Sequence, residues 1–322
     1  MSNRSDILGR GFEYVFITEL KKSVEKTRPV EILDTPEYEN VKEKWNSCNS
    51  EEKDNLKYSA IAGIEELYSL EPLILNDGKD LLELSIQPDS AGEEGDVRDV
   101  LLIRRGISWE IGVSLKHNHE AVKHSRLSRS LDFANSWFQE PCTPQFWKDV
   151  ASVFEYTERQ RQLNKTWNDL GNDKIKKVYL PLLNAFVDEV NRQYAAHGTE
   201  IPKKMVEYLL GKYDFYKVIG KDSTGETLVE VFNMNGTLNK YKQTKPRVIL
   251  PVAILPKRIV HIGIIPGSTN KVEIILDKGW AFTFRIHNAS TKVENSVKFD
   301  IQLEGKPAAV QVFQRRWVKE ND

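Results

Sequence analysis

The clearest alternation of apolar and polar residues lies between residues 96 and 116. Two short apolar runs flank Arg104-Arg105-Gly106-Ile107, which predicts a hairpin turn because glycine adopts positive φ angles at little cost. The second run alternates over residues 109–116, as expected for a strand with one buried face. The polar face of this strand carries, in order, Glu110, Gly112, Ser114 and Lys116.

A two-residue loop at Arg105-Gly106 would set Asp99, at the start of the first strand, opposite Gly112 on this polar face. Asp99 would then lie within reach of Ser114 and Lys116. A carboxylate at a strand end suits Mg²⁺, and a nearby lysine can hold an attacking water and offset phosphate charge. The alternative interpretation is an ordinary amphipathic hairpin whose polar face is solvated.

Helical periodicity governs the chain before the hairpin. A helix is predicted from Ser5 to about Lys26, and residues 37–68 are predicted to form a pair of charged helices. Glu13 falls within the apolar pattern of the first helix. A carboxyl group in that position lies at the boundary of the apolar face or points into a site.

Beyond the hairpin, the apolar spacing favours a helix over residues 121–131 and helices throughout 144–210, with their aromatic side chains in a core. Gly, Pro and Asn divide the rest into short β-prone runs. We therefore expect three consecutive segments: a catalytic core over 1–140, a helical segment over 141–212 and a β-rich lobe over 213–322. The predicted strands are 81–86, 215–219, 227–232, 247–254, 271–276, 281–287, 296–303 and 308–313.

Length, charge and cysteine content exclude some classes of protein but do not identify a function. A chain of 322 residues can bury a full core, and its net charge of −1 means that any nucleic-acid surface must be local. The two cysteines, Cys48 and Cys142, do not make a disulfide framework and fit a reducing compartment. The N-terminus lacks the apolar core of a signal peptide, and no apolar stretch is long enough to span a membrane. We expect a cytoplasmic protein without a membrane partner.

One local concentration of positive charge follows the hairpin, where half of the six histidines also fall. It is interpreted as a helix that contacts phosphates beside the metal site, and the alternative is a solvated basic helix. The histidines, together with Glu120, also raise the alternative of a zinc hydrolase. Zinc needs three or four converging ligands, whereas histidines at a strand–helix joint would diverge. The cluster comprises His117, His119, Lys123, His124, Arg126 and Arg129.

Three segments carry a resemblance to a known family. The first joins Gly95-Asp-Val-Arg-Asp99 to Val113-Ser-Leu-Lys116-His-Asn-His-Glu-Ala-Val-Lys-His-Ser-Arg126. The second is Gly9-Arg-Gly-Phe-Glu13, and the third is Gly279-Trp-Ala-Phe-Thr-Phe-Arg-Ile-His-Asn-Ala-Ser290 with the following residues 296–300. Together they resemble the HaeIII-type family of type II restriction endonucleases, nearly from end to end.

The resemblance implies an α/β fold with a PD-(D/E)XK restriction-endonuclease-like core, a mixed central sheet flanked by helices, and a β-rich C-terminal lobe. It also implies Mg²⁺-dependent DNA hydrolysis. Asp99 matches the motif aspartate, with Asp96 as its rival, and Lys116 matches the motif lysine. Ser114 stands where the motif has an acid, so a second metal carboxylate must come from elsewhere. The candidates are, in order, Glu120, Glu13 and Glu110.

The resemblance further implies double-stranded DNA cut at a short palindrome, GGCC, with 5′-phosphate ends, as part of restriction-modification. A palindrome favours a homodimer, and a cognate DNA methyltransferase would act on the same site. The alternatives are a DNA-binding module or a repair-type nuclease with a degenerate metal site, and a structural role for Arg285 and His287 paired with Asp300 or Asp277. The candidate DNA contacts are His119, Lys123, Arg126, Arg285, His287, Asn288, Ser290 and Lys298.

Overall fold

The computed structural model describes residues 4–76, 78–93, 95–241 and 248–319. The chain forms two compact units that are not consecutive segments. The first unit comprises residues 1–120, 211–253 and 308–322, and the second comprises residues 121–210 and 254–307. The contacts therefore divide the chain differently from the three consecutive segments expected from the sequence, because the β-rich C-terminal third contributes to both units.

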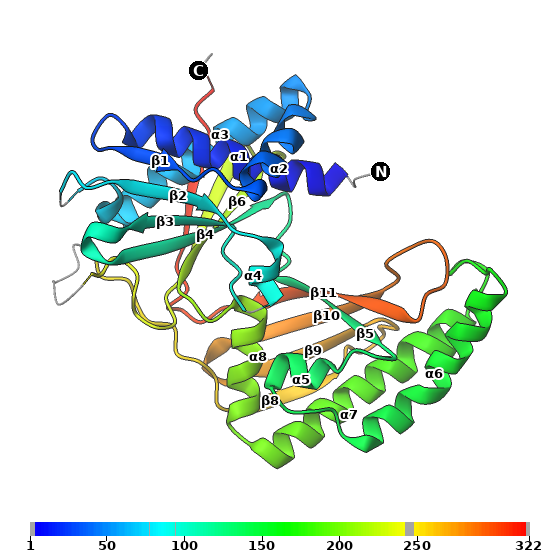
Figure 1. The fold of residues 1–322 in the computed structure, drawn as a ribbon. Coiled ribbons are helices and arrows are strands. Elements are labelled where there is room, and N and C mark those ends of the chain that lie inside the picture. The colour runs from blue at the N-terminus through cyan, green and yellow to red at the C-terminus, as the bar shows by residue number, and fades with distance from the viewer. Residues whose placement is uncertain (1–3, 77, 94, 242–247, 320–322) are drawn as a thin grey trace. The chain divides into compact units, whose positions relative to one another are not determined.

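A seven-stranded mixed sheet forms the centre of the first unit (Figure 1). In spatial order its strands are β1 (Val30–Ile32), β2 (Leu82–Ile86), β3 (Val100–Arg104), β4 (Trp109–His117), β6 (Phe215–Lys221), β7 (Glu226–Phe232) and β12 (Val312–Arg316). β3 and β4 form an antiparallel hairpin, whereas β4 and β6 pair in parallel. Parallel neighbours need a long connection, and here that connection contains residues 118–214.

Three long helices cover this sheet: α1 (Arg4–Val24), α2 (Pro36–Asn46) and α3 (Ser50–Leu70). α1 packs against β4, and α3 packs against β6 and β7 (Figure 1). Gly11 lets α1 approach the end of α2 closely, since an added Cβ would lie 3.1 Å from Cys48 Sγ. The predicted first helix and helical pair are confirmed. The short elements of the unit are η1 (Pro72–Ile74), α4 (Asp89–Glu93) and η2 (Arg105–Ile107).

The second unit is built on a five-stranded antiparallel sheet with helices against one face. In spatial order its strands are β5 (Lys123–Ser128), β11 (Ser296–Gly305), β10 (Ala281–His287), β9 (Lys271–Leu276) and β8 (Ile259–Ile264). Its helical elements are α5 (Phe133–Phe138), α6 (Pro144–Gln162), the π-helical turn η3 (Lys174–Tyr179), α7 (Leu180–His197) and α8 (Glu200–Leu210), with η4 (Asp277–Gly279) between strands.

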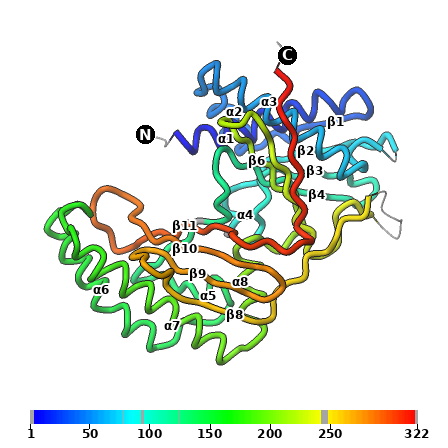
Figure 2. The backbone as a smooth tube through the Cα atoms, turned by 180° about the vertical axis from the view of Figure 1, so that it is seen from behind, coloured from blue at the N-terminus to red at the C-terminus, as the bar shows by residue number. Residues whose placement is uncertain are grey.

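Aromatic side chains form the core between these helices and the sheet. Both views show α6 and α7 side by side (Figures 1 and 2). The ring of Phe186 on α7 lies 5.0 Å from that of Phe299 and 5.5 Å from that of Phe284, measured between centroids. Alternate residues of β10 and β11 are buried, so the opposite face of the sheet carries their polar side chains. The prediction that the aromatics of the helical segment are core residues is confirmed for Phe146, Phe154 and Trp167.

Local structure differs from the predictions in several places; the strand predicted over 308–313, for example, begins only at Val312. Residues 123–128 form a strand rather than part of the helix predicted over 121–131, because they pair with β11, far away in the sequence. Residues 248–254 form no strand, because side chains of Asn233 and Asn239 take up carbonyl groups of this segment; residue 247 lies outside the described residues. The strand nearest to it, β8, was not predicted.

None of the helices within the described ranges combines the length and the apolar composition needed to cross a membrane.

Candidate active site

The hairpin of β3 and β4 brings together Asp99, Ser114 and Lys116. Asp99 Oδ2 accepts hydrogen bonds from the Leu115 amide at 2.6 Å, from Ser114 Oγ at 3.1 Å and from Lys116 Nζ at 3.3 Å. The Asp99 amide donates to the carbonyl of Val113 at 2.9 Å. Backbone pairing thus fixes the position of the carboxylate, and Lys116 adds a charge-assisted contact.

The register of this hairpin differs by two residues from the predicted one. The connection is a 3₁₀ turn over Arg105–Ile107 followed by Ser108 with a φ of 53°, so it is longer than a two-residue loop. Gly112 therefore pairs with Leu101 and not with Asp99. A shift of two residues keeps every side chain on its original face, which is why the predicted reach of Asp99 along the polar face is confirmed.

Glu13 lies close enough to Asp99 and Lys116 for its charge to interact with both. Its side chain is buried, and Arg10 Nη1 donates to its two oxygens at 2.9 and 3.2 Å. Burial raises the pKa of Glu13 to about 8; the negative charge of Asp99 adds to this rise, whereas Arg10 and Lys116 oppose it. The repulsion between the two carboxyl groups would be relieved by a cation held between them.

Asp96 and Glu110 belong to a different cluster, which is centred on Arg98. The guanidinium of Arg98 donates to Asp96 from Nε at 2.8 Å and from Nη2 at 2.7 Å, and to Glu110 from Nη1 at 2.9 Å. Its aliphatic part lies against Gly112, where an added Cβ would come within 2.0 Å of Arg98 Cδ. Both acids are thus bonded to Arg98 rather than to the group formed by Asp99, Ser114 and Lys116.

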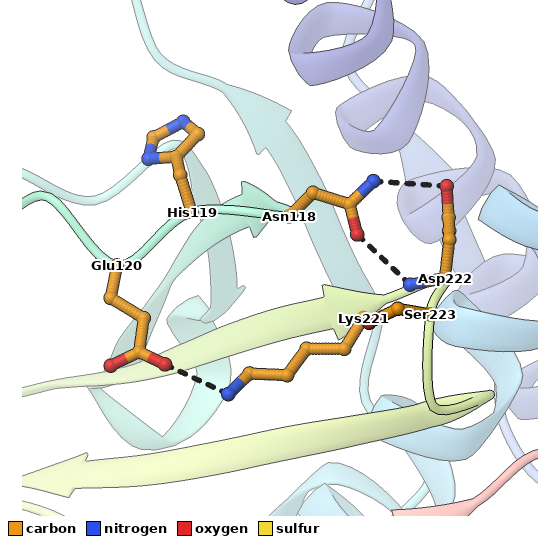
Figure 3. Close-up of a pocket in the computed structure, with 6 residues that line it drawn as sticks. All are labelled: Asn118, His119, Glu120, Lys221, Asp222 and Ser223. Atoms are coloured by element: carbon orange, nitrogen blue, oxygen red, sulfur yellow. Dashed lines mark hydrogen bonds and ion pairs between the residues drawn. The ribbon is translucent and has the colours of Figure 1, made fainter.

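Glu120 lies in the loop between β4 and β5, where the sequence predicted the approach to a helix. Its carboxylate pairs with Lys221 Nζ at 2.8 Å, and its carbonyl accepts a hydrogen bond from Lys217 Nζ at 2.8 Å. The imidazole of His119 points away from the Glu120–Lys221 pair (Figure 3). Two lysines of β6 thus hold the residue that the sequence ranked first as the second metal ligand.

The ends of β4 and β6 line a pocket of about 510 Å³. His117 Nε2 lies 3.0 Å from both carboxylate oxygens of Asp222, and Asn118 Nδ2 donates to Asp222 at 2.9 Å (Figure 3). Burial by itself would raise the pKa of Asp222, but the hydrogen bonds from His117 and Asn118 outweigh it and lower this pKa. The lining residues are Asn118, His119, Glu120, Lys221, Asp222 and Ser223.

Within the described ranges, no three side chains of His, Cys, Asp or Glu converge as a site made wholly of protein ligands requires. The zinc alternative is therefore not supported: His117 is bonded to Asp222, and the side chain of His124 lies outside the described part. The pair formed by Asp99 and Glu13 suits Mg²⁺ better. This ion prefers carboxylate oxygens, binds through one or two of them and keeps several waters.

The second unit aligns several of the predicted DNA contacts across its sheet. Arg126 on β5, Lys298 on β11 and His287 on β10 occupy directly opposed positions. In the neighbouring row of β10 and β11, Arg285 donates to Asp300 Oδ2 from Nη2 at 2.9 Å and from Nε at 3.3 Å. The pairing of Arg285 with Asp300 that was considered as an alternative is thus present.

The remaining predicted contacts have local partners. Lys123 Nζ lies 3.8 Å from the centre of the Tyr208 ring and donates to the Tyr208 carbonyl at 3.1 Å, which disfavours a phosphate contact. Asn288 Nδ2 donates to the carbonyl of Ser290 at 2.7 Å, and Ser290 Oγ donates to that of Lys292 at 2.8 Å. These two side chains shape the turn between β10 and β11.

Four residues around the site were missed by the sequence reasoning: Arg10, Lys217, Lys221 and Asp222. Arg10 had a signal, because it precedes Glu13 by three residues on a predicted helix and therefore shares its side of that helix. The other three lie on or just after β6, and 101 residues separate Lys221 from Glu120. A parallel pairing over that distance leaves no local pattern.

Comparisons with known proteins cover nearly the whole chain. A family model described as HaeIII restriction endonuclease matches residues 9–307. The chain is similar to the type II restriction enzyme HaeIII of Haemophilus aegyptius, with 45% identity over 318 residues that cover 98% of this chain and 99% of the relative. No solved structure matches the chain.

These matches define the class: the chain is a type II restriction endonuclease, a site-specific deoxyribonuclease whose substrate is double-stranded DNA. Within that class it belongs to the HaeIII restriction endonuclease family. The resemblance seen in the sequence is confirmed. The mixed α/β architecture with its large mixed sheet is compatible with a restriction-endonuclease fold, and the PD-(D/E)XK core stays a prediction.

Proposed function

We propose that this enzyme cuts DNA at GGCC in a Mg²⁺-dependent reaction carried out by Asp99, Glu13 and Lys116. The observation that carries the proposal is the meeting of Lys116 Nζ with Asp99 Oδ2 at 3.3 Å beside the buried carboxyl of Glu13. The target GGCC follows from membership of the HaeIII family, and the PD-(D/E)XK assignment follows from the same resemblance. The contact of Lys116 with Asp99 and the interaction of the Glu13 charge with both support the residue roles.

Asp99 and Glu13 would hold the Mg²⁺ ion. When bound, Mg²⁺ offsets charge on a phosphate oxygen and favours ionisation of water. Glu13 is the better second carboxylate because its charge and that of Asp99 interact. Ser114 stands at the position of the missing motif acid and donates to Asp99, so its role is to orient that carboxylate.

Lys116 orients the attacking water and offsets the negative charge that builds up on the phosphate oxygens. Its contact with Asp99 keeps the ammonium group beside the cation site. Water attacks phosphorus in line with the P–O3′ bond and releases a proton to the solvent, and the P–O3′ bond breaks as the new P–O bond forms. A solvent proton completes the 3′ hydroxyl, so the other product carries a 5′ phosphate.

The polar face of the second unit's sheet would contact the DNA. Arg126, Lys298 and His287 lie in one row across three strands, which suits contacts along a phosphate backbone. Arg285 would present its guanidinium to a guanine edge while Asp300 fixes its orientation. A palindromic target would be bound by a two-fold homodimer, and a cognate methyltransferase would modify the same site.

Digestion of a mapped plasmid tests this proposal directly. With Mg²⁺ we expect fragments whose sequenced ends all fall within GGCC and carry 5′ phosphates, and with EDTA we expect uncut DNA. Ends at another sequence would refute the target. Cutting that persists in EDTA, or cutting restored by Zn²⁺ but not by Mg²⁺, would refute the assignment of the cation.

A further inference from the structure

Arg10 connects the buried acid of the candidate site to the surface of the first unit. Its Nη1 contacts both carboxylate oxygens of Glu13, three residues later on α1. Its Nη2 pairs with Asp89 on α4, whose side chain is 85% exposed. The Arg10 side chain is itself mostly buried, at 18% exposed. One guanidinium thus spans the distance between the two acids.

This arrangement restricts the Glu13 side chain. A glutamate has several rotatable bonds, and only a second contact besides its own backbone can select one orientation of its carboxylate. The planar guanidinium provides that contact to both oxygens, while Asp89 holds the guanidinium from its other side. Lysine could replace the charge but not the two-sided geometry, because its ammonium group is a single point. The helix beneath is fixed by Phe12 and Phe16, which are fully buried.

We propose that Arg10 is a positioning residue, which holds the Glu13 carboxylate where it can share a divalent cation with Asp99. This inference rests on the proposed role of Glu13 in cation binding. The contacts of Arg10 are with Glu13 and Asp89. Arg10 acts through Glu13, as partners behind a metal ligand do in other metal sites.

The test measures Mn²⁺ affinity of the full-length chain by electron paramagnetic resonance, and the Mg²⁺ concentration that gives half-maximal cleavage of a GGCC duplex. For Arg10→Gln we expect the Mn²⁺ affinity to fall by about tenfold and the half-maximal Mg²⁺ concentration to rise by the same factor, with smaller changes for Arg10→Lys. The matched control is Arg161→Gln on α6, which breaks another arginine–glutamate pair three residues apart. The control should leave both values at those of the wild type.

A coupling measurement separates positioning from a general structural role. In a Glu13→Gln background, Arg10→Gln should add no further loss of Mn²⁺ affinity, because its target is already gone. An additional tenfold loss there would overturn the proposal, and so would wild-type affinity in Arg10→Gln. Should Arg10→Gln fail to fold in a thermal scan, Arg10→Lys decides: wild-type affinity overturns the proposal, and weakened affinity supports it.

The outcomes also separate this inference from the proposed function. If Glu13→Gln itself keeps wild-type Mn²⁺ affinity, the role of Glu13 fails and the role of Arg10 fails with it. If Glu13→Gln loses affinity and Arg10→Gln does not, only the inference about Arg10 is wrong. If the wild type does not cut DNA in Mg²⁺, the proposed function fails, while the Mn²⁺ measurement still decides the role of Arg10.

Discussion

Two clusters of charged side chains lie close together along the hairpin of the first unit, and they satisfy their acids in different ways. In the Arg98 cluster, one buried guanidinium contacts Asp96 and Glu110 and lies 4.3 Å from the centre of the Tyr213 ring. Every donor nitrogen of that guanidinium has a partner within the protein. Such an arrangement of one arginine between two acids is typical of a contact that stabilises the fold.

The Asp99–Glu13–Lys116 cluster has the opposite character. Burial and the charge of Asp99 raise the pKa of Glu13 to about 8 in spite of Arg10 and Lys116. Perturbed acids of this kind gather where a protein holds charges for chemistry rather than for stability. Asp96 and Asp99 are three residues apart in the sequence, but Arg98 contacts Asp96 whereas Lys116 contacts Asp99.

The largest effect should come from Lys116→Ala, which removes the cation beside Asp99. We expect single-turnover cleavage to slow on the order of 10³-fold, because the phosphate loses its compensating charge, while specific DNA binding persists. The control is Lys22→Ala, at a lysine whose side chain is 67% exposed on the same unit. Cleavage by Lys116→Ala at the wild-type rate would show that the site has been assigned to the wrong cluster.

Arg98→Ala should lower the stability of the fold, and this effect would distinguish the Arg98 cluster from the Asp99–Glu13–Lys116 cluster. Removal of the arginine leaves Asp96 and Glu110 without their shared cation, and breaking a buried pair in this way costs about 3 kcal/mol. Urea denaturation measures this change in the free energy of unfolding. An unchanged midpoint, together with lost cleavage, would mean that Arg98 serves the reaction instead of the fold.

Glu71 is a third acid of the first unit, and it differs from both clusters because it is buried beside the neutral groups of Tyr216 and Asn239. Burial raises its pKa from 4.5 to about 7, although hydrogen bonds from the Tyr216 hydroxyl and the Asn239 amide oppose the rise. The folded chain therefore keeps a proton that the unfolded chain has lost, so the contribution of Glu71 to stability is fully present below pH 4.5 and is lost as the pH rises towards 7.

The variant Glu71→Gln should reduce this loss by up to about 3 kcal/mol, since one pKa unit corresponds to about 1.4 kcal/mol. The measurement is the free energy of unfolding in urea between pH 4.5 and 7, in EDTA. Identical pH profiles for the variant and the wild type would contradict the raised pKa of Glu71.

The smallest effect should come from Arg285→Ala in the second unit. If Arg285 reads a guanine, discrimination against a changed base pair at that position should fall by about 1–3 kcal/mol. Its ion pair with Asp300 is 47% exposed on the arginine side, so its loss should cost under about 1 kcal/mol of stability. Competition binding with single-substitution duplexes distinguishes these roles; unchanged discrimination would leave Arg285 a structural residue.

Local patterns in the sequence were sufficient for the hairpin and for the elements before it. The alternation over residues 109–116 placed Ser114 and Lys116 on one face, and the exact length of the turn did not matter, because an error of two residues preserves the face. The helical period likewise placed Glu13 within the apolar pattern of the first helix, either at its boundary or pointing into a site. Its proximity to Asp99 depended on packing of α1 against β4, which the sequence alone does not encode locally.

Interactions between segments that are distant in the sequence explain why the helix over 121–131 was wrongly predicted and why the surroundings of Glu120 were not foreseen. Residues 123–128 suit a helix by spacing, yet Leu127 is buried because it pairs with Val297 in the sheet. Glu120 was ranked first as a ligand on the assumption of that helix. In the structure, Lys217 and Lys221 reach it from β6, and a single sequence carries no sign of that pairing.

The central claim is that Asp99 and Glu13 together hold a divalent cation. The most direct test is the binding of Mn²⁺ to three variants of the full-length chain. Asp99→Ala and Glu13→Gln should each abolish or strongly weaken binding, whereas Glu110→Gln, in the Arg98 cluster, should bind as the wild type does. Normal binding by the first two variants, with loss in the third, would contradict the account.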